Sequence, residues 1–455
     1  MANGINYTKV GGYFLIAAVA SLIFVDCREI GTVQTKESLK HNKAVIKTIK
    51  GDGGHVIDCV DIYKQPALNH PLLINHTIEL KPSSYPNGIE AISLEDELFQ
   101  YWRQNGECPE GTIPIVRTQG VDHHRSKPRF NPKEIGSTPS TGHEYAQVGM
   151  YDGGYYGAQA RLNVWNPASF NGEISITQTW IVGGQGQELS TLEAGWLVRS
   201  PDSQTRLFIF WTGDNYQGGC YNLDCPGFVQ INSKVAIGYP ITPISIYNGT
   251  QYDIFLSIYK NTVSGHWWLQ VGNEAVGYWP DTIVPGLRGS AEIISWGGEI
   301  FNSKPEGHHT STQMGSHHFP IEGFGRASYV RNIQYLDNSS QFKDAEHLRT
   351  YATNPKCYDV LVKDKTSNFG THMYYGGPAF LNPFVMILQR DKSTECYVVK
   401  KLKVNSMMRG LWTLGNKIQI EFTKGNRYYN IGEGSRASNL TKDGFLWGKG
   451  ESRQM

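Results

Sequence analysis

The stretch Ile174-Ser175-Ile176-Thr177-Gln178-Thr179-Trp180-Ile181-Val182 carries large apolar side chains at most of its even positions. Because side chains along a strand point alternately to two faces, this period of two predicts a β-strand. Similar runs occur at residues 206–211, 252–259 and 266–271, with Gly, Asn, Pro or Asp between them. Many short strands separated by turn residues predict an antiparallel sandwich or barrel over residues 143–336.

The composition agrees with a strand-and-turn protein. The chain has 455 residues, so two folded units with extensions are expected. Aromatic residues make up 12%, glycines number 50, and charged residues are only 18%, below the usual quarter. The net charge of +1 gives no sign of nucleic-acid binding. The charge is uneven, because residues 379–455 hold 13 Lys/Arg against 6 Asp/Glu. This basic tail therefore differs in composition from the rest.

The first 27 residues are typical of a secretory signal. Lys9 precedes an apolar run over residues 10–25, which is shorter than the roughly 20 residues that span a bilayer. No later stretch is long and apolar enough to cross a membrane. We therefore expect a secreted protein with no membrane attachment after removal of the signal. Possible glycosylation sequons agree with export; they begin at Asn75, Asn248, Asn338 and Asn439.

The region between the signal and the strand-rich part divides by composition. Residues 28–118 form a candidate first unit, with short strands expected at 45–49 and 56–60 and a short amphipathic helix at 94–103. Residues 119–142 are polar and Pro-rich, with little to bury, and such exposed segments are where proteases cut. The sequence therefore predicts a leader, a linker that can be processed, and a β-rich domain.

Seven cysteines in an exported chain make disulfides the default expectation. Cys220 and Cys225 can close a small loop, and Cys59 and Cys108 can staple the first unit. If Cys27 leaves with the signal, Cys357 and Cys396 remain. No pair has the CxxC spacing that suggests zinc.

Two glutamates stand in apolar strand contexts rich in Gly and Trp. Glu193 lies in Leu192-Glu193-Ala194-Gly195-Trp196, and Glu299 ends Trp296-Gly297-Gly298-Glu299. Burial disfavours the charge of a carboxylate, so two such groups brought together share a proton and suit acid–base chemistry. Acid peptidases and glycosidases both use carboxyl pairs, and residue type alone leaves the two open.

Other candidates for chemistry are weaker. The doubled histidines His308-His309 and His317-His318 have no HExxH motif, so we expect no metal site. Ser311 and Ser316 lack a GxSxG setting for a nucleophile. Eight of the eleven tryptophans fall between Trp165 and Trp296, more than a core needs, and we expect some to line a substrate groove. Such a groove also fits a non-enzymatic β-sandwich that binds cell-wall glycans.

The residues around both glutamates resemble those of the neprosin family, plant secreted proteins that are similar to glutamic prolyl endopeptidases. The resemblance covers roughly residues 45–378. It rests on matching runs at residues 56–67, 70–73, 106–115, 192–196, 219–223, 225–230, 267–269, 276–280, 297–299, 310–316 and 374–378.

The resemblance implies a mainly β fold, with an antiparallel β-sandwich catalytic domain at 143–378 preceded by a smaller activation domain at 28–118. It implies that the activation domain is removed in acid, in part by self-cleavage, with Pro128 and Pro132 as candidate points. Glu193 and Glu299 match the catalytic glutamates of a peptidase that cuts after proline at acid pH without metal or cofactor. We expect a monomer that acts on proline-containing peptides.

The resemblance further implies disulfides Cys220–Cys225 and Cys59–Cys108. The sequence departs from the family after Pro378, where members end in a terminal cysteine that pairs with the one matching Cys357. We interpret residues 379–455 as disordered or as the product of a gene-model error, which leaves Cys357 unpaired. The alternative is that Cys396 replaces the missing partner.

Overall fold

The computed structural model describes residues 44–89, 100–117, 142–170, 172–303 and 309–379, together with five short strands between 388 and 430. The chain divides into units 1–44 and 45–455, and all elements below lie in the second. The predicted signal, most of the linker, Cys27, Cys396, His308 and Asn439 lie outside the described residues. Within the described part, no helix is long and apolar enough to cross a membrane.

A small antiparallel sheet precedes the main domain, in the order β1-β2-β3. Its strands are β1 (Val45–Lys50), β2 (Val56–Asp61) and β3 (Thr112–Val116). Cys59 of β2 is bonded to Cys108, with an S–S distance of 2.05 Å. The helix expected at 94–103 lies mostly outside the described residues, and Tyr101–Asn105 forms a 3-10 helix instead. Its Trp102 packs in a cluster with Ala236 and Tyr239 of the main domain.

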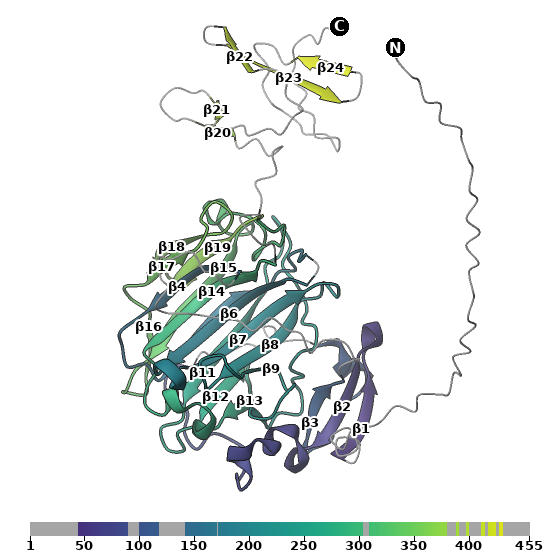
Figure 1. Cartoon of the computed structure of the whole chain (residues 1–455), viewed down its shortest axis with the longest axis vertical. Coiled ribbons are helices and arrows are strands. Elements are labelled where there is room, and N and C mark those ends of the chain that lie inside the picture. The colour runs from purple at the N-terminus through teal and green to yellow at the C-terminus, as the bar shows by residue number, and fades with distance from the viewer. Residues whose placement is uncertain are drawn as a thin grey trace, which may run out of the picture. The chain divides into compact units, whose positions relative to one another are not determined.

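The main domain contains a seven-stranded antiparallel sheet in the order β17-β4-β14-β6-β7-β8-β9 (Figure 1). The predicted strand at 174–182 is its centre, since β6 pairs with β14 on one side and β7 on the other. The strands are β4 (His143–Met150), β6 (Ile174–Gly183), β7 (Ser190–Arg199), β8 (Arg206–Thr212), β9 (Cys220–Tyr221), β14 (Ile293–Phe301) and β17 (Arg349–Ala352).

A second antiparallel sheet has the order β10-β13-β12-β11-β5-β15-β19-β18, with β16 paired to β15. The runs predicted at 252–259 and 266–271 are β11 and β12, each displaced by no more than one residue. The strands are β5 (Gly157–Asn163), β10 (Val229–Gln230), β11 (Asp253–Lys260), β12 (Trp267–Val271), β13 (Glu274–Trp279), β15 (Ser328–Leu336), β16 (Phe342–Asp344), β18 (Asp359–Thr366) and β19 (Gly370–Gly376).

The remaining elements are short. The other 3-10 helices are Asp52–Gly54, Ile62–Lys64, Pro66–Asn69, Pro71–Leu73, Gly186–Glu188, Asp281–Ile283, Pro285–Leu287 and Pro320–Glu322. In the basic tail the structure describes β20 (Leu388–Arg390), β21 (Tyr397–Val399), β22 (Leu411–Leu414), β23 (Lys417–Lys424) and β24 (Arg427–Asn430).

The main core lies between the two large sheets and contains most of the tryptophans. Trp196 of β7 and Trp296 of β14 pack there with Trp267 and Trp268 of β12. The expectation of a Trp-lined groove is therefore largely wrong, because seven of the eight tryptophans, all but Trp180, belong to this core. The physical reason is the strand period: Trp196 is three residues from Glu193, so the two side chains point to opposite faces of the sheet.

Candidate active site

The structure places Glu193 and Glu299 on strands that flank β6. Glu193 of β7 is opposite Trp180, and Glu299 of β14 is opposite Ile176. Gln178 lies midway between these two positions of β6. Residues two apart on a strand share a face, so Ile176, Gln178 and Trp180 point to the same side as the two glutamates. This side is turned away from the second sheet and is here called the outer face. The two glutamates therefore stand diagonally across β6 with Gln178 between them.

Glycines lie directly opposite Gln178 on both adjacent strands, so no side chain is present at either position. Gly195 of β7 and Gly297 of β14 are its partners on the two adjacent strands. A Cβ on Gly195 would lie 1.9 Å from the Thr177 carbonyl oxygen, and one on Gly297 would lie 2.4 Å from that of Ala146. Only glycine fits these positions, which is the physical reason for the Gly residues seen beside both glutamates in the sequence.

Glu193 is fully buried with one carboxyl oxygen unsatisfied. Thr191 Oγ1 donates to its Oε1 at 3.0 Å and the Tyr216 hydroxyl does so at 3.4 Å. Its Oε2 accepts no hydrogen bond from the described residues. Burial raises the pKa of Glu193 well above its usual range, the negative charge of Glu299 raises it further, and donors, including Gln178, offset this only in part. Burial and the neighbouring charge therefore favour the protonated form of Glu193.

Glu299 is held by donors on both oxygens. His143 Nδ1 lies 2.6 Å from Oε1, and Gln178 Nε2 donates to Oε2 at 2.8 Å. Both His143 and Glu299 are almost completely buried. Both oxygens of Glu299 therefore have partners, whereas Oε2 of Glu193 has none among the described residues.

Sequence reasoning missed His143 and Gln178. Gln178 left a faint signal, because it is the polar residue among Ile174, Ile176, Trp180 and Val182 on one face of a strand. His143 left none, since it lies 156 residues from Glu299 and meets it only through the pairing of β4 with β14.

Aromatic side chains surround the pair on the outer face. This cluster consists of tyrosines and phenylalanines with a single tryptophan, Trp180. Burial, then the charges of Glu299, Tyr216 and Glu193, raise the pKa of Tyr145 well above its usual range, so its hydroxyl stays protonated. The aromatic members are Tyr145, Trp180, Phe208, Phe210, Tyr216, Tyr221 and Tyr351.

The other candidate groups have partners elsewhere. His309 Nε2 lies 3.0 Å from Glu144 Oε2, and His318 Nδ1 lies 3.0 Å from Glu322. Although burial opposes it, hydrogen bonds from the His309 ring to Cys357 and Glu144 raise the pKa of His309 to about 10. Among the described residues, no group of three or more His, Cys, Asp or Glu is arranged to hold a metal ion.

The two serines considered as nucleophiles, Ser311 and Ser316, differ in exposure. Ser316 is buried, and its Oγ accepts from the backbone of His318 at 3.3 Å. Ser311 is exposed.

The cysteines pair as the family resemblance implies. Cys220 and Cys225 form a disulfide with an S–S distance of 2.00 Å, beside the one between Cys59 and Cys108. Cys357 is a free thiol among the described cysteines. The sequon residues Asn75, Asn248 and Asn338 are all exposed.

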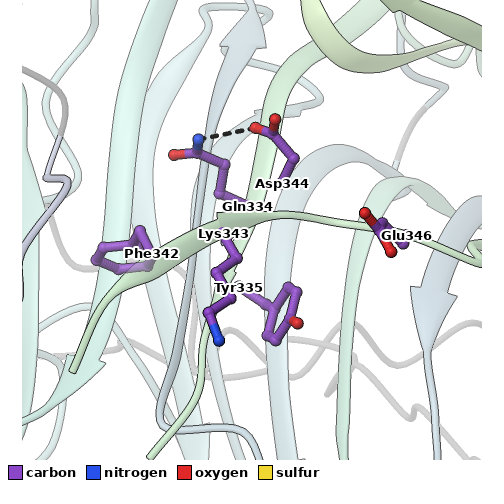
Figure 2. A pocket seen from close by; sticks show the side chains of 6 residues that line it. All are labelled: Gln334, Tyr335, Phe342, Lys343, Asp344 and Glu346. Atoms are coloured by element: carbon purple, nitrogen blue, oxygen red, sulfur yellow. Dashed lines mark hydrogen bonds between the residues drawn. The ribbon is translucent and has the colours of Figure 1, made fainter. Parts of the chain in front are cut away.

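A surface hollow lies on the second sheet (Figure 2). It is formed by residues of β15 and β16, where Gln334 Nε2 donates to Asp344 Oδ1 at 2.9 Å. Asp344 also pairs with Lys365, and Lys343 pairs with Asp337. The hollow lies on a different sheet from the two glutamates. Its lining residues are Gln334, Tyr335, Phe342, Lys343, Asp344 and Glu346.

Comparison with known families shows to which family the chain belongs. The family described as Neprosin matches residues 171–378, which include both glutamates and Gln178. The family described as Neprosin activation peptide matches residues 47–149. The chain belongs to the neprosin family. An activation peptide ahead of the neprosin domain makes the chain a peptidase precursor.

Solved structures similar to this chain include two peptidases. One is scytalido-glutamic peptidase with a peptide-based transition state analog, at 10% identity and a TM-score of 0.29, covering 52% of this chain and 98% of that one. Another is SCP-B, of the eqolisin family, with the tripeptide Ala-Ile-His, at the same identity, TM-score and coverage. A β-porphyranase from Bacteroides plebeius has 8% identity and a TM-score of 0.20, covering 33% and 53%. These scores are too low to support a conclusion about function.

Proposed function

We propose that this chain is the secreted precursor of a glutamic endopeptidase that cuts peptide bonds after proline at acid pH. The observation that carries the proposal is the asymmetric pair of buried carboxyls. Glu193 has a raised pKa and an unsatisfied oxygen, whereas Glu299 has donors on both oxygens. Two acids whose surroundings separate their protonation states supply an acid and a base at one site.

In the proposed reaction, a water molecule lies between the two side chains. Glu299 removes its proton as the water oxygen attacks the scissile carbonyl carbon. The Glu193 carboxyl donates a hydrogen bond to the developing oxyanion and then gives its proton to the nitrogen as the C–N bond breaks. The pair ends with one proton, as it began. The proposed mechanism uses carboxyl groups alone and requires no metal or cofactor.

The protonation of Glu193 sets the direction of the pH dependence. The mechanism needs Glu193 protonated, and the raised pKa keeps it so to a higher pH than an exposed glutamate. Activity is lost as the pH rises through that pKa, because the pair then lacks its acid. Acid conditions therefore favour the working state.

The match to an activation peptide at residues 47–149 supports synthesis as a precursor. Glu193 is 0% exposed and Glu299 is 1% exposed in the chain that still carries its activation peptide. A substrate cannot contact carboxyls that are closed to solvent, so side chains of the outer face must move before a peptide binds, and we propose that removal of the N-terminal region comes before that movement. We propose the polar linker at 119–142 as the place of cleavage, with Pro128 and Pro132 as candidate points. The mature enzyme is proposed to act as a monomer on proline-containing peptides, outside the cell.

The test is cleavage of a Pro-containing peptide by purified, acid-treated protein at acid and neutral pH, beside Glu193→Gln and Glu299→Gln. We expect cutting after proline at acid pH, absent in both variants, and none when that proline is replaced by alanine. If the matured protein cuts no peptide but binds or hydrolyses cell-wall glycans, the glycan-binding or glycosidase alternative replaces the peptidase.

A further inference from the structure

Gln147 lies on the outer face beside the carboxyl pair. It belongs to β4 and is opposite Gly297 of β14, and Gly297 is in turn opposite Gln178 of β6. Reading across the sheet from β7 to β4, one row therefore contains Gly195, Gln178, Gly297 and Gln147. Glu193 and Glu299 occupy the rows on either side. Gln147 is two residues along β4 from Tyr145, the partner of Glu299, a distance of about 7 Å.

The amide of Gln147 is buried without a partner. Its side chain is 0% exposed, and neither Oε1 nor Nε2 makes a hydrogen bond to the described residues. A buried amide without hydrogen bonds is destabilising, so native structures satisfy nearly all such groups. The Oε1 atom of Gln178, in the same row, is also unsatisfied. Unused hydrogen-bonding capacity is thus present beside the proposed catalytic pair.

The chemistry of this row matches a peptide main chain. A primary amide offers one acceptor and two donors, so it can accept from the N–H and donate to the C=O of an extended peptide. Gly297 has no side chain, and a Cβ there would lie 2.8 Å from the Cβ of Gln147, so a main chain is not blocked between the two glutamines.

We propose that Gln147 is a substrate-binding residue whose amide hydrogen-bonds the main chain of the bound peptide within about two residues of the scissile bond. This inference rests on the proposed peptidase function. It predicts that the contact is insensitive to the side chain of the substrate residue at that position, because it is made to the main chain.

The test compares acid-matured Gln147→Met with the parent enzyme. Methionine has a similar length and no hydrogen-bonding amide. Since a neutral–neutral hydrogen bond to substrate is lost, kcat/KM is expected to fall about tenfold. The melting temperature of the precursor should stay level or rise, because an unsatisfied buried amide has been removed. A lower melting temperature with unchanged kcat/KM would show a structural residue and overturn the proposal.

A matched control is available on β6, which is separated from β4 by β14. Thr179 of β6 has a buried hydroxyl that is also unsatisfied, but its position on the strand places it on the opposite face from Gln178. Thr179→Val should leave kcat/KM within about twofold, as expected for a change away from the site. Equal losses in Thr179→Val and Gln147→Met would contradict a specific role for Gln147.

Ester substrates give a sharper readout. Replacing one substrate amide by an ester removes a single N–H. At the position bound by Gln147 this change should reduce kcat/KM for the parent but cause no further loss in Gln147→Met, because the two changes remove one interaction. If every ester in a series lowers kcat/KM by the same factor in the parent and in Gln147→Met, Gln147 does not bind the main chain.

A binding experiment separates failure of this inference from failure of the proposed function. Peptide affinity is measured by fluorescence anisotropy with matured Glu193→Gln, alone and combined with Gln147→Met. An uncleaved peptide with the parent enzyme overturns the peptidase proposal, whereas a weaker affinity in the combined variant still supports Gln147 as a binding residue. Equal affinities overturn that role whether or not the parent cleaves.

Discussion

The outer face of the seven-stranded sheet and the contact between residues 71–87 and β12–β13 both bury ionisable side chains. On the outer face, the buried groups are the acids Glu193 and Glu299. At the contact, His76 Nε2 lies 2.7 Å from the Tyr278 hydroxyl, and the His266 ring stacks on Tyr278 with centroids 5.0 Å apart.

Acid acts on these two regions in opposite senses. Burial raises the pKa of Glu193, so a falling pH favours the protonated form that burial already prefers. Burial lowers the pKa of His76 and lowers that of His266 to about 4, so a falling pH forces charge onto groups that the contact keeps neutral. One change in pH therefore prepares the proposed active site and weakens a contact of the N-terminal region.

The largest effect is expected from the carboxyl pair itself. Glu193→Gln and Glu299→Gln should each reduce kcat of the acid-matured enzyme by about 10³-fold, because each removes a group that transfers a proton in the reaction. The measurement is the initial rate of peptide cleavage at acid pH. Activity within tenfold of the parent in either variant would contradict the assigned role.

Glu173 is the matched control for these variants. It is as buried as Glu193, but both of its carboxyl oxygens accept hydrogen bonds. Ser303 N and Oγ donate to Oε1 at 2.9 and 2.8 Å. The hydroxyls of Thr310 and Thr312 donate to Oε2. Glu173→Gln should lower the melting temperature and leave kcat little changed. The two sites differ in satisfaction of the carboxyl oxygens rather than in burial.

The next effect concerns the donor to Glu299. His143→Phe keeps the ring that packs 5.0 Å from Phe301 but removes the hydrogen bond to Glu299 Oε1. Loss of a charge-assisted hydrogen bond, about 1.5–3 kcal/mol, should lower kcat about 10- to 100-fold with little change in KM. The measurement is kcat and KM from initial rates of peptide cleavage over a full pH profile.

His372 provides the control for that change. It is buried in β19, and its Nδ1 lies 3.0 Å from the Gly370 carbonyl oxygen two residues away. His372→Phe should leave kcat and the pH profile unaltered. A parallel loss in both histidine variants would show a general effect on folding and weaken the role given to His143.

The smallest effect is expected at the contact with the N-terminal region. His266 Nδ1 accepts a hydrogen bond from the Asp281 backbone N–H at 3.3 Å. Besides Tyr278, the charged or titratable groups around His266 are Asp281, Glu79, His76 and Lys260. Because the pKa values of His266 and His76 are below the ordinary 6.5, their contribution is complete above pH 6.5 and is lost as the pH falls toward 4.

His266→Phe should therefore make the contact less sensitive to pH over this window. Hydrogen exchange of residues 71–87 is compared at each pH in a Glu193→Gln background, which is expected not to cleave itself. Glu79 opposes the histidines, because burial raises its pKa and penalises its charged form. Glu79→Gln should accordingly slow exchange at neutral pH. If exchange has the same pH dependence in the parent and in His266→Phe, then His266 does not cause the pH sensitivity of the contact.

Much of the β architecture could be predicted from local pattern. The runs at 174–182, 206–211, 252–259 and 266–271 became β6, β8, β11 and β12, because a period of two is a property of neighbouring residues. The same local reasoning misjudged the tryptophans. Strand period shows that Trp196 and Glu193 face opposite sides, but not which side meets the second sheet.

The sequence by itself determined the strands, the neprosin relationship and the two glutamates, since each is written in contiguous residues. Only the tertiary structure decided that β14 and β7 both border β6, which sets Gln178 between the acids and brings His143 to Glu299. It also decided how the two acids differ, because desolvation and hydrogen bonding depend on neighbours that are over a hundred residues away in the chain. Strand formation is local, whereas the division of a carboxyl pair into acid and base is set by long-range pairing.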